Sequence, residues 1–258
     1  MTEIGDAFRG GKALVAFVTC GDPDLETTAG IVRAMAANGA DLVELGIPFS
    51  DPTAEGPVIQ GANVRALRAG TTTDKVLDMA ESLSREVSIP LAFMTYANVV
   101  FSYGTDRFLE RCEKAGIKGL ILPDVPFEEK EEFEPACRRH GIDLISMVAP
   151  TSHGRIRKIA EESRGFLYVV SSLGVTGTRS EITTDIAPMI GAIRESTDTP
   201  CAVGFGISTP EQAKKMSELA DGVIIGSAVV KIVAQYGKDS AGPVGEFIRS
   251  VKEKIREP

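Results

Sequence analysis

Features that would place this chain in several other protein classes are missing from its sequence. No segment approaches the roughly 20 consecutive apolar residues that a membrane-spanning helix needs, and the first residues lack the basic start and apolar run of a signal peptide. Lys and Arg total 28 against 36 Asp and Glu, which gives a net charge of −8 without any basic run. This balance argues against nucleic acid or an anionic membrane as a partner. We therefore expect a soluble cytoplasmic protein.

Residues that commonly build metal centres, disulfides and nucleophilic sites are scarce or dispersed. The chain has four cysteines, at Cys20, Cys112, Cys137 and Cys201. They lie far apart with no paired-ligand spacing, so we expect reduced, partly buried thiols rather than a disulfide framework or a zinc site. The two histidines, His140 and His153, fall at a helix end and a helix start. No cluster has metal-ligand spacing, and no Ser–His–acid set can be assembled.

The 258 residues instead show a repeated order of helix, glycine and apolar strand. Gly39, Gly116 and Gly141 each follow a helical stretch, where glycine readily takes the left-handed conformation, and an apolar strand begins shortly afterwards. The expected strands are Ala13–Cys20, Asp41–Ile47, Leu91–Tyr96, Gly119–Val125, Asp143–Ala149, Phe166–Ser172, Cys201–Gly206 and Gly222–Gly226. Amphipathic segments separate nearly all of them, for example Leu25–Ala37, Thr105–Ala115, Glu128–Arg139 and Pro210–Ala220.

Eight alternating strand–helix units in a chain of this length predict a closed (β/α)8 barrel, the TIM-barrel fold, rather than an open sheet. The sequence between the second and third strands leaves room for an extra helix at about Val58–Ala69, and we expect another at the N-terminus. No linker or low-complexity segment interrupts the pattern. The prediction is one α/β domain that spans residues 1–258.

A carboxylate lies in the middle of the second expected strand. Glu44 is surrounded there by Leu, Val and Ile, which indicates a strand buried on both faces. Burying an unpaired carboxylate costs several kcal/mol, roughly, unless the group is protonated, paired or hydrogen-bonded. Glu44 is therefore either an acid whose raised pKa serves catalysis or a structural acid bonded to backbone amides. The strand alone does not decide between them.

Other reactive side chains are expected at the carboxyl ends of the strands, where such barrels carry their chemistry. Glu55 lies in the loop after the second strand, Tyr96 ends the third, Asp124 is near the end of the fourth, and Tyr168 is within the sixth. Every lysine falls in a loop start or a helix, whereas Schiff-base chemistry needs one inside the barrel mouth.

Glycine-rich turns follow the last three strands, at 174–177, 204–208 and 226–227. Glycine lets the backbone approach a ligand, and the free amides and positive dipole of a helix N-terminus suit a phosphate. Tight turns that merely need positive φ are the alternative, but their recurrence in successive late loops favours a phosphate site. Two carboxylates, a few tyrosines and a phosphate anchor favour proton transfer on a sugar-phosphate-like substrate. The fold hosts many such reactions, so the pattern leads no further.

Several motifs resemble the tryptophan synthase α subunit family. They are Phe17–Pro23, Glu44–Pro52, Tyr96–Asn98, Gly174–Gly177 and Gly204–Ser208, in the family's order over almost the whole chain. The resemblance implies a (β/α)8 barrel that cleaves indole-3-glycerol phosphate to indole and glyceraldehyde 3-phosphate without a cofactor. It also implies a partner, a β subunit that uses pyridoxal phosphate and receives the indole in an αββα complex.

The resemblance also implies roles for individual residues. Glu44 matches the catalytic glutamate, which protonates indole C3 and takes the proton of the glycerol hydroxyl, and Tyr168 matches a tyrosine near it. Glu55 stands where the family has an aspartate that bonds the indole N–H and stabilises the cation as it forms. Its extra methylene is the chief departure from the family pattern.

The remaining matches belong to substrate binding. The residues that match walls of the indole pocket are Phe17, Met94, Tyr96, Ile121 and Phe205, and for each of them ordinary core packing is the alternative. The residues that match the phosphate site are Gly177, Gly206, Gly226 and Ser227. Thr176, in a loop that is a lid in this family, matches a residue that helps to position Asp124. No residue is expected to bind a metal.

Three other functions remain to be weighed. A sugar-phosphate isomerase of the same fold would need its base at a different strand end, and the pair Glu44 and Glu55 argues against it. A stand-alone indole-releasing lyase would share the active-site residues but lack a surface for the β subunit. A mainly regulatory α subunit with weakened catalysis is kept open by the substitution at Glu55.

Overall fold

The nine strands of the computed structural model, which describes residues 3–170, 186–204 and 206–257, form one parallel sheet. The strands are β1 (Ala13–Thr19), β2 (Leu42–Gly46), β3 (Leu91–Met94), β4 (Gly119–Ile121), β5 (Asp143–Leu144), β6 (Ser146–Val148), β7 (Leu167–Val170), β8 (Cys201–Gly204) and β9 (Gly222–Ile225). Their order in the sheet is β5-β4-β3-β2-β1-β9-β8-β7-β6.

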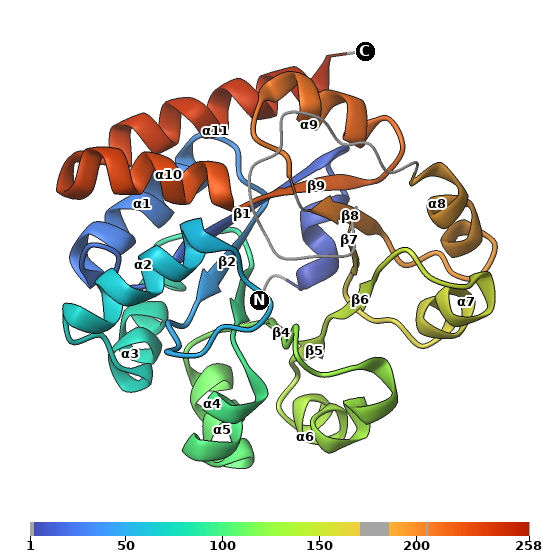
Figure 1. The fold of residues 1–258 in the computed structure, drawn as a ribbon, viewed down its shortest axis with the longest axis horizontal. Helices are drawn as coiled ribbons and strands as arrows, with labels where there is room; N and C mark the ends of the chain where they lie inside the picture. The colour runs from blue at the N-terminus through green and yellow to red at the C-terminus, as the bar shows by residue number, and fades with distance from the viewer. Residues whose placement is uncertain (1–2, 171–185, 205, 258) are drawn as a thin grey trace.

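The two ends of this sheet lie in the same stretch of chain. Only Ile145 separates β5, which pairs with β4, from β6, which pairs with β7. The sheet therefore closes on itself, and β5 and β6 together make the fifth of eight strands (Figure 1). The predicted (β/α)8 barrel is confirmed.

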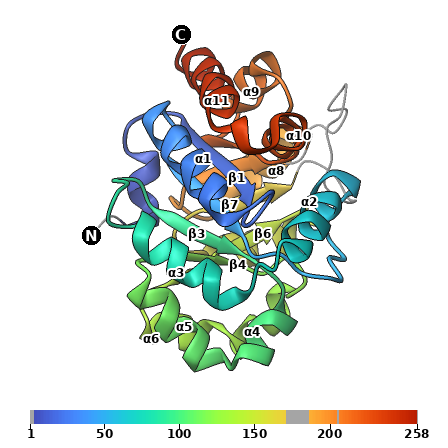
Figure 2. The same cartoon turned by 90° about the vertical axis from the view of Figure 1, so that its left-hand side faces the viewer.

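Helices surround the strands on the outside of the barrel, and η1 lies at one end of it (Figures 1 and 2). In chain order they are η1 (Ile4–Phe8), α1 (Leu25–Ala37), α2 (Pro57–Arg68), α3 (Thr73–Leu83), α4 (Ala97–Tyr103), α5 (Thr105–Lys114), η2 (Phe127–Glu132), α6 (Glu134–Arg139), α7 (His153–Glu161), α8 (Ala187–Arg194), α9 (Pro210–Ser217), α10 (Ser227–Tyr236), η3 (Gly237–Asp239) and α11 (Ala241–Arg256). None of the helices described here is long and apolar enough to cross a membrane.

Both extra helices are present, at opposite ends of the barrel (Figure 2). The N-terminal one, η1, is a short 3-10 helix whose Ile4 and Ala7 are buried against the residues inside the barrel. The second, α2, follows the loop after β2 and begins at Pro57, where a proline is well tolerated because the first helical amides have no partner within the helix. Thus η1 closes one end of the barrel, and α2 stands beside the end that the strands point to.

One predicted helix, Glu128–Arg139, is wrong as a continuous element. The structure has the 3-10 helix η2 followed by the six-residue helix α6, with Phe133 between them. Pro135 at the start of α6 explains the break, because proline has no amide hydrogen to donate and fits only the first turn of a helix. The outer cover between β4 and β5 is therefore thinner than a full helix would provide.

The core has an outer and an inner layer, because side chains alternate between the two faces of each strand. Val43 and Leu45 of β2 pack outward in the large cluster under the helices, whereas Leu42 packs inward in a second cluster that also contains Ala92 and Ile121. Glu44, two residues after Leu42, therefore faces the barrel interior. It lies towards the carboxyl end of β2, where chemistry is expected.

Candidate active site

Glu44 lies fully buried between two neighbouring strands. Its backbone is in register with Phe17 of β1 and Ala92 of β3, and its side chain is 0 % exposed. Neither carboxyl oxygen has a hydrogen-bond partner among the described residues. Burial alone raises the pKa of Glu44 from 4.5 to about 8, because the charged form loses its hydration. Within the described part of the chain, no backbone amide supports the alternative of a structural acid.

Tyr168 comes from β7, on the far side of the barrel from β2, and also faces inward. Its ring lies over Gly204 of β8, where an added Cβ would come within 2.7 Å of the phenolic oxygen. Burial, and next the charge of Glu44, raise the pKa of Tyr168 well above its usual value. The structure therefore brings Glu44 and a neutral phenol together, as the resemblance implied.

Phe17 and Met94 form part of the wall above these groups. Phe17 belongs to a small buried cluster with residues of α2 and α10, and Met94 packs against the same cluster. The ring of Phe17 passes over Gly46, where a Cβ would lie 2.6 Å from its Cζ. Ile121 lies in the inner cluster, next to Met94 in the register of β3 and β4. Three of the expected indole-pocket residues are thus inward-facing neighbours.

Glu55 is held by two side chains that its own loop does not supply. Asn63 of α2 donates from Nδ2 to Oε2 of Glu55 at 2.5 Å, and the hydroxyl of Tyr96 also bonds the carboxylate. Burial raises the pKa of Glu55 to about 7, while the hydrogen bonds from Asn63 and Tyr96 oppose the shift. The Tyr96 hydroxyl accepts in turn from the amide of Ala54 at 3.2 Å. Glu55 is therefore a fixed, buried acid with a raised pKa.

Asn63 was not predicted, although a signal for it exists. It lies eight residues after Glu55 on the buried face of an amphipathic helix, where an amide needs a hydrogen-bonding partner. The same helix is anchored by Arg65, whose guanidinium donates to both carboxyl oxygens of Asp22 at 2.8 Å. Asp22 is only 2 % exposed. The loop after β1 thus fixes α2, and α2 fixes Glu55.

The expected phosphate site lies partly at the start of α10. Gly226 precedes this helix and Ser227 is its first residue, and no side chain caps its N-terminus within the described residues. Helix α9 differs, because Thr209 accepts from the amide of Gln212 and so caps its first turn. Gly206 has a φ of +88°, so its turn does require glycine, whereas Gly226 has a φ of −122° and does not. Of these two helices, α10 is therefore the one whose amide end has no side-chain cap among the described residues.

Asp124 caps another helix. Both of its carboxyl oxygens accept from the amide of Ala97, at 3.1 Å each, at the start of α4 and next to Tyr96. Its side chain is exposed at the carboxyl end of the barrel. The residue expected to help position it, Thr176, lies outside the described residues, as do Gly177, Phe205 and the rest of the lid loop.

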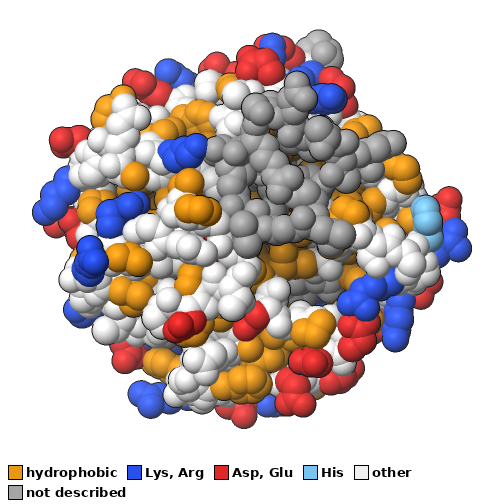
Figure 3. Space-filling view, in the orientation of Figure 1, with side chains coloured by type: hydrophobic (Ala, Val, Ile, Leu, Met, Phe, Trp, Pro, Cys, Tyr) orange, Lys and Arg blue, Asp and Glu red, His pale blue; other side chains and the backbone are white. Residues whose placement is uncertain are grey.

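Charge is unevenly distributed at this end of the molecule. In Figure 3 the Lys, Arg, Asp and Glu side chains lie mostly around the periphery, and apolar side chains lie nearer the centre. Within the described residues, no group of three or more His, Cys, Asp and Glu side chains could hold a metal ion. The site offers two buried carboxyl groups in different settings: Glu44, which has no hydrogen-bond partner among the described residues, and Glu55, which Asn63 and Tyr96 hold in place.

Comparison with known proteins identifies the family. A sequence model described as "Tryptophan synthase alpha chain" matches residues 6–256. This chain belongs to the tryptophan synthase alpha chain family. Its function is the cleavage of indole-3-glycerol phosphate in tryptophan biosynthesis, which is a lyase reaction. This is the function that the sequence resemblance implied.

Relatives match over nearly their full length. The tryptophan synthase alpha chain of Lacticaseibacillus casei is 46 % identical over 255 residues, which cover 99 % of this chain and 96 % of that one. The alpha chain of Geobacter sulfurreducens is 46 % identical over 246 residues, 95 % of this chain and 93 % of that one. A solved structure of Mycobacterium tuberculosis tryptophan synthase superimposes with a TM-score of 0.88 at 32 % identity and covers 99 % and 97 % of the two chains.

The buried acid makes stability depend on pH. Because the folded protein holds the Glu44 proton up to about pH 8 and the unfolded chain releases it near 4.5, the folded state binds more protons between these values. The contribution of Glu44 to stability should therefore fall as pH rises through this window, by up to about 1.4 kcal/mol per pH unit, and level off above it.

Urea unfolding of the wild type and of Glu44→Gln at several pH values in this window measures the difference between their free energies of unfolding. We expect the glutamine variant to gain on the wild type steadily with pH, while Glu55 contributes equally to both. A constant difference across the whole window would contradict the raised pKa of Glu44.

Proposed function

We propose that Glu44, Glu55 and Tyr168 carry out the cleavage of indole-3-glycerol phosphate inside one barrel domain, at the carboxyl ends of its strands. The observation that carries this proposal is the state of Glu44, which is buried inside the barrel, lacks a hydrogen-bond partner among the described residues and has a pKa near 8. A carboxyl group whose pKa is close to the working pH can both donate and accept a proton within one turnover.

Glu44 acts first as an acid and then as a base. Its neutral carboxyl group protonates C3 of the indole ring, which leaves the ring cationic. The carboxylate then takes the proton of the glycerol hydroxyl next to the bond that breaks, and the electrons of that carbon–carbon bond return to the ring. Indole and glyceraldehyde 3-phosphate result, and Glu44 regains its proton.

Glu55 stabilises the positive charge in between. Its carboxylate accepts a hydrogen bond from the indole N–H, and this bond strengthens as the ring becomes cationic. Asn63 and Tyr96 hold the carboxylate in place before the charge appears, so little reorganisation is needed. Glu55 acts in this way only in its ionised form, which predominates above its pKa of about 7.

The remaining groups bind and orient the substrate. The phenol of Tyr168 stays protonated beside Glu44 and can donate a hydrogen bond there. The other proposed binding residues are Phe17, Met94, Tyr96, Ile121 and Phe205 around the indole ring, Gly177, Gly206, Gly226 and Ser227 at the phosphate, and Asp124 with Thr176 between them. The uncapped start of α10 supports the phosphate assignment, because its amides and dipole favour an anion.

The reaction as proposed requires no cofactor, because side chains of this chain supply both proton transfers. We propose further that a β subunit binds the chain in an αββα complex and receives the indole, and that pyridoxal phosphate belongs to that partner. The solved structures of Mycobacterium tuberculosis tryptophan synthase among the relatives support this partner.

Replacing Glu44 by glutamine should remove most of the turnover. Glu44→Gln keeps the size of the side chain but cannot exchange the proton, so indole release should fall by roughly 10²-fold or more while the fold and substrate binding remain. The matched control is Glu26→Gln, at an exposed position on α1, which should keep full activity. Near-normal turnover of Glu44→Gln would end the assignment.

Replacing Glu55 separates its charge from its length. Glu55→Ala should abolish cleavage, with a loss of roughly 10²-fold or more, because nothing then opposes the positive charge on the ring. Glu55→Asp should retain or raise activity, since the family has aspartate at this position. Steady-state assays of indole release would show this. Cleavage that Glu55→Ala leaves unchanged would make the loop acid a structural group only.

Adding a β subunit of the family distinguishes the proposed complex from its two alternatives. We expect indole release by the chain alone to be measurable and to rise when the β subunit is present, because a partner that binds the active conformation more tightly shifts the chain towards it. A chain whose rate never responds would be a stand-alone lyase. A chain that releases no indole by itself, but changes the activity of the β subunit, would be regulatory.

A further inference from the structure

The barrel wall has a seam between β4 and the fifth strand. β4 pairs with β5 only at Gly119–Asp143 and Leu120–Leu144, and the amide of Ile145 donates to Leu120 at 2.9 Å. Beyond that bond, no backbone hydrogen bond joins the chain after Ile121 to β6 within the described residues. β6 instead pairs with β7. The chain after β4 and strand β6 therefore separate towards the carboxyl end of the barrel. The separation begins at Ile145, between β5 and β6.

The outer layer does not close this seam. Even the eight-residue helices α8 and α9 of later units are longer than the cover here, which consists of the six-residue η2 and the six-residue α6. Helix α7 flanks the gap on its other side. A cavity of about 320 Å³ lies between them, at the lower end of the size range of small-molecule sites.

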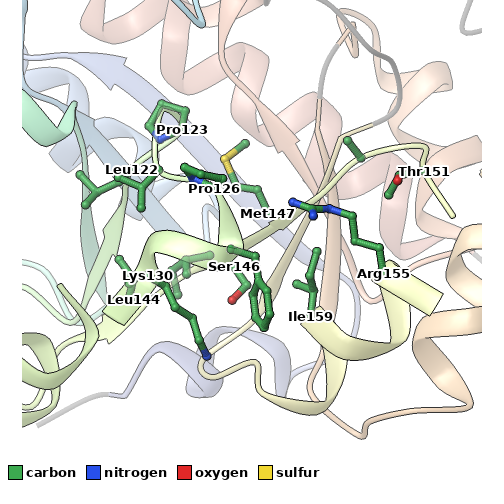
Figure 4. A pocket seen from close by; sticks show the side chains of 14 residues that line it. Leu122, Pro123, Pro126, Lys130, Leu144, Ser146, Met147, Thr151, Arg155 and Ile159 are labelled. Atoms are coloured by element: carbon green, nitrogen blue, oxygen red, sulfur yellow. The ribbon is translucent and has the colours of Figure 1, made fainter. Parts of the chain in front are cut away.

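The walls of this seam cavity are apolar and come from both edges (Figure 4). Leu122 and Pro123 lie on one edge and Met147 on the other, with the ring of Phe127 and Ile159 of α7 on the outer side. Prolines, a phenyl ring and a thioether are surfaces on which a flat aromatic molecule packs well. Because Met147 also packs against the inner cluster, the seam cavity borders the barrel interior.

Charged groups at the seam cavity are already neutralised. Lys130 forms ion pairs with Glu134 at 3.3 Å and with Glu162 at 2.7 Å. Arg155 is paired through both terminal nitrogens with the carboxylate of Glu128. A charged ligand would have to displace one of these partners, whereas an uncharged one would not. Ser146, whose hydroxyl group faces this space, offers one polar contact (Figure 4).

We propose that the seam cavity is a second binding site, separate from the catalytic groups, for a flat, uncharged aromatic molecule of the size of indole. The splayed strands set its shape, the apolar lining favours an aromatic ring, and Ser146 can accept a hydrogen bond from a ring N–H. Indole, the product of the proposed reaction, is in this class, and the choice of indole as ligand rests on the proposed function. At this site released indole would be held beside the barrel rather than at Glu44.

Two methionines make the site directly observable. Met147 lines the seam cavity, and Met94 lies in the proposed indole pocket of the active site. With 13C-methyl methionine in the protein, each methyl signal can be assigned by a Met147→Leu or a Met94→Leu variant. The active site is first filled with an unreactive analogue that joins an indole ring to a phosphate, which should shift Met94. Indole is then added.

We expect the Met147 signal to shift and saturate, with a midpoint on the order of 1 mM, as for a small ligand in an apolar pocket. Ser146→Leu, which fills the seam cavity, should weaken this binding tenfold or more. Ser250→Leu, at an exposed serine of α11, should leave it unchanged. Indole-3-acetate, which adds a carboxylate, should bind the wild type at least tenfold more weakly than indole, and this comparison does not depend on any variant folding.

The site is refuted if Met147 does not respond to indole in a protein whose Met94 has responded to the analogue. Equal affinity for indole and indole-3-acetate would refute the proposed ligand class, and full indole binding by Ser146→Leu would refute the location. Failure of the proposed function would give a different result, because the Met94 signal would then not respond to the analogue.

Discussion

The chemistry proposed for this structure depends on the burial of one carboxyl group, that of Glu44, inside a closed barrel. Burial without a partner is unfavourable for a charge, so the fold that encloses Glu44 also keeps it protonated near neutral pH. Closure requires that β5 and β6 continue one another across Ile145. The alternation of side chains then turns Glu44 inward, and glycines opposite Phe17 and Tyr168 leave space for their rings. Catalytic geometry and barrel packing are thus the same set of contacts.

The two acids of the site are buried in different ways. Glu44 has no hydrogen-bond partner among the described residues, and its pKa is raised the more of the two. Glu55 is bound by Asn63 and Tyr96, which limit the shift and fix the carboxylate. A proton-transfer group needs an accessible change of charge, whereas a group that stabilises a cation needs a fixed negative charge. The side chain of Glu55, longer by one methylene than the family's aspartate, reaches Asn63 of α2, which donates to its carboxylate at 2.5 Å.

Local pattern was enough to predict the barrel and the place of Glu44, because strand burial and the glycines after three of the helices, Gly39, Gly116 and Gly141, can be recognised in short stretches of sequence. It was not enough for Asn63 or for the pair Asp22–Arg65, since these contacts depend on how α2 lies against the loops after β1 and β2. Pro135 could have signalled the break between η2 and α6. The seam had no signal in a pattern, because Asp143–Ala149 is as apolar as a strand paired on both sides. Register between separate strands decides it.

The protonation state of Glu44 itself tests this account most directly. With 13C in the glutamate carboxyl groups, the signal that is absent from the spectrum of Glu44→Gln belongs to Glu44. Its chemical shift can be followed as the pH rises from 4.5, the ordinary pKa of a glutamate, to above 8. The account predicts that this signal changes near pH 8, in the free protein and without substrate. A change near pH 4.5 would show an exposed or paired carboxylate, and the buried proton donor at the centre of the mechanism would be contradicted.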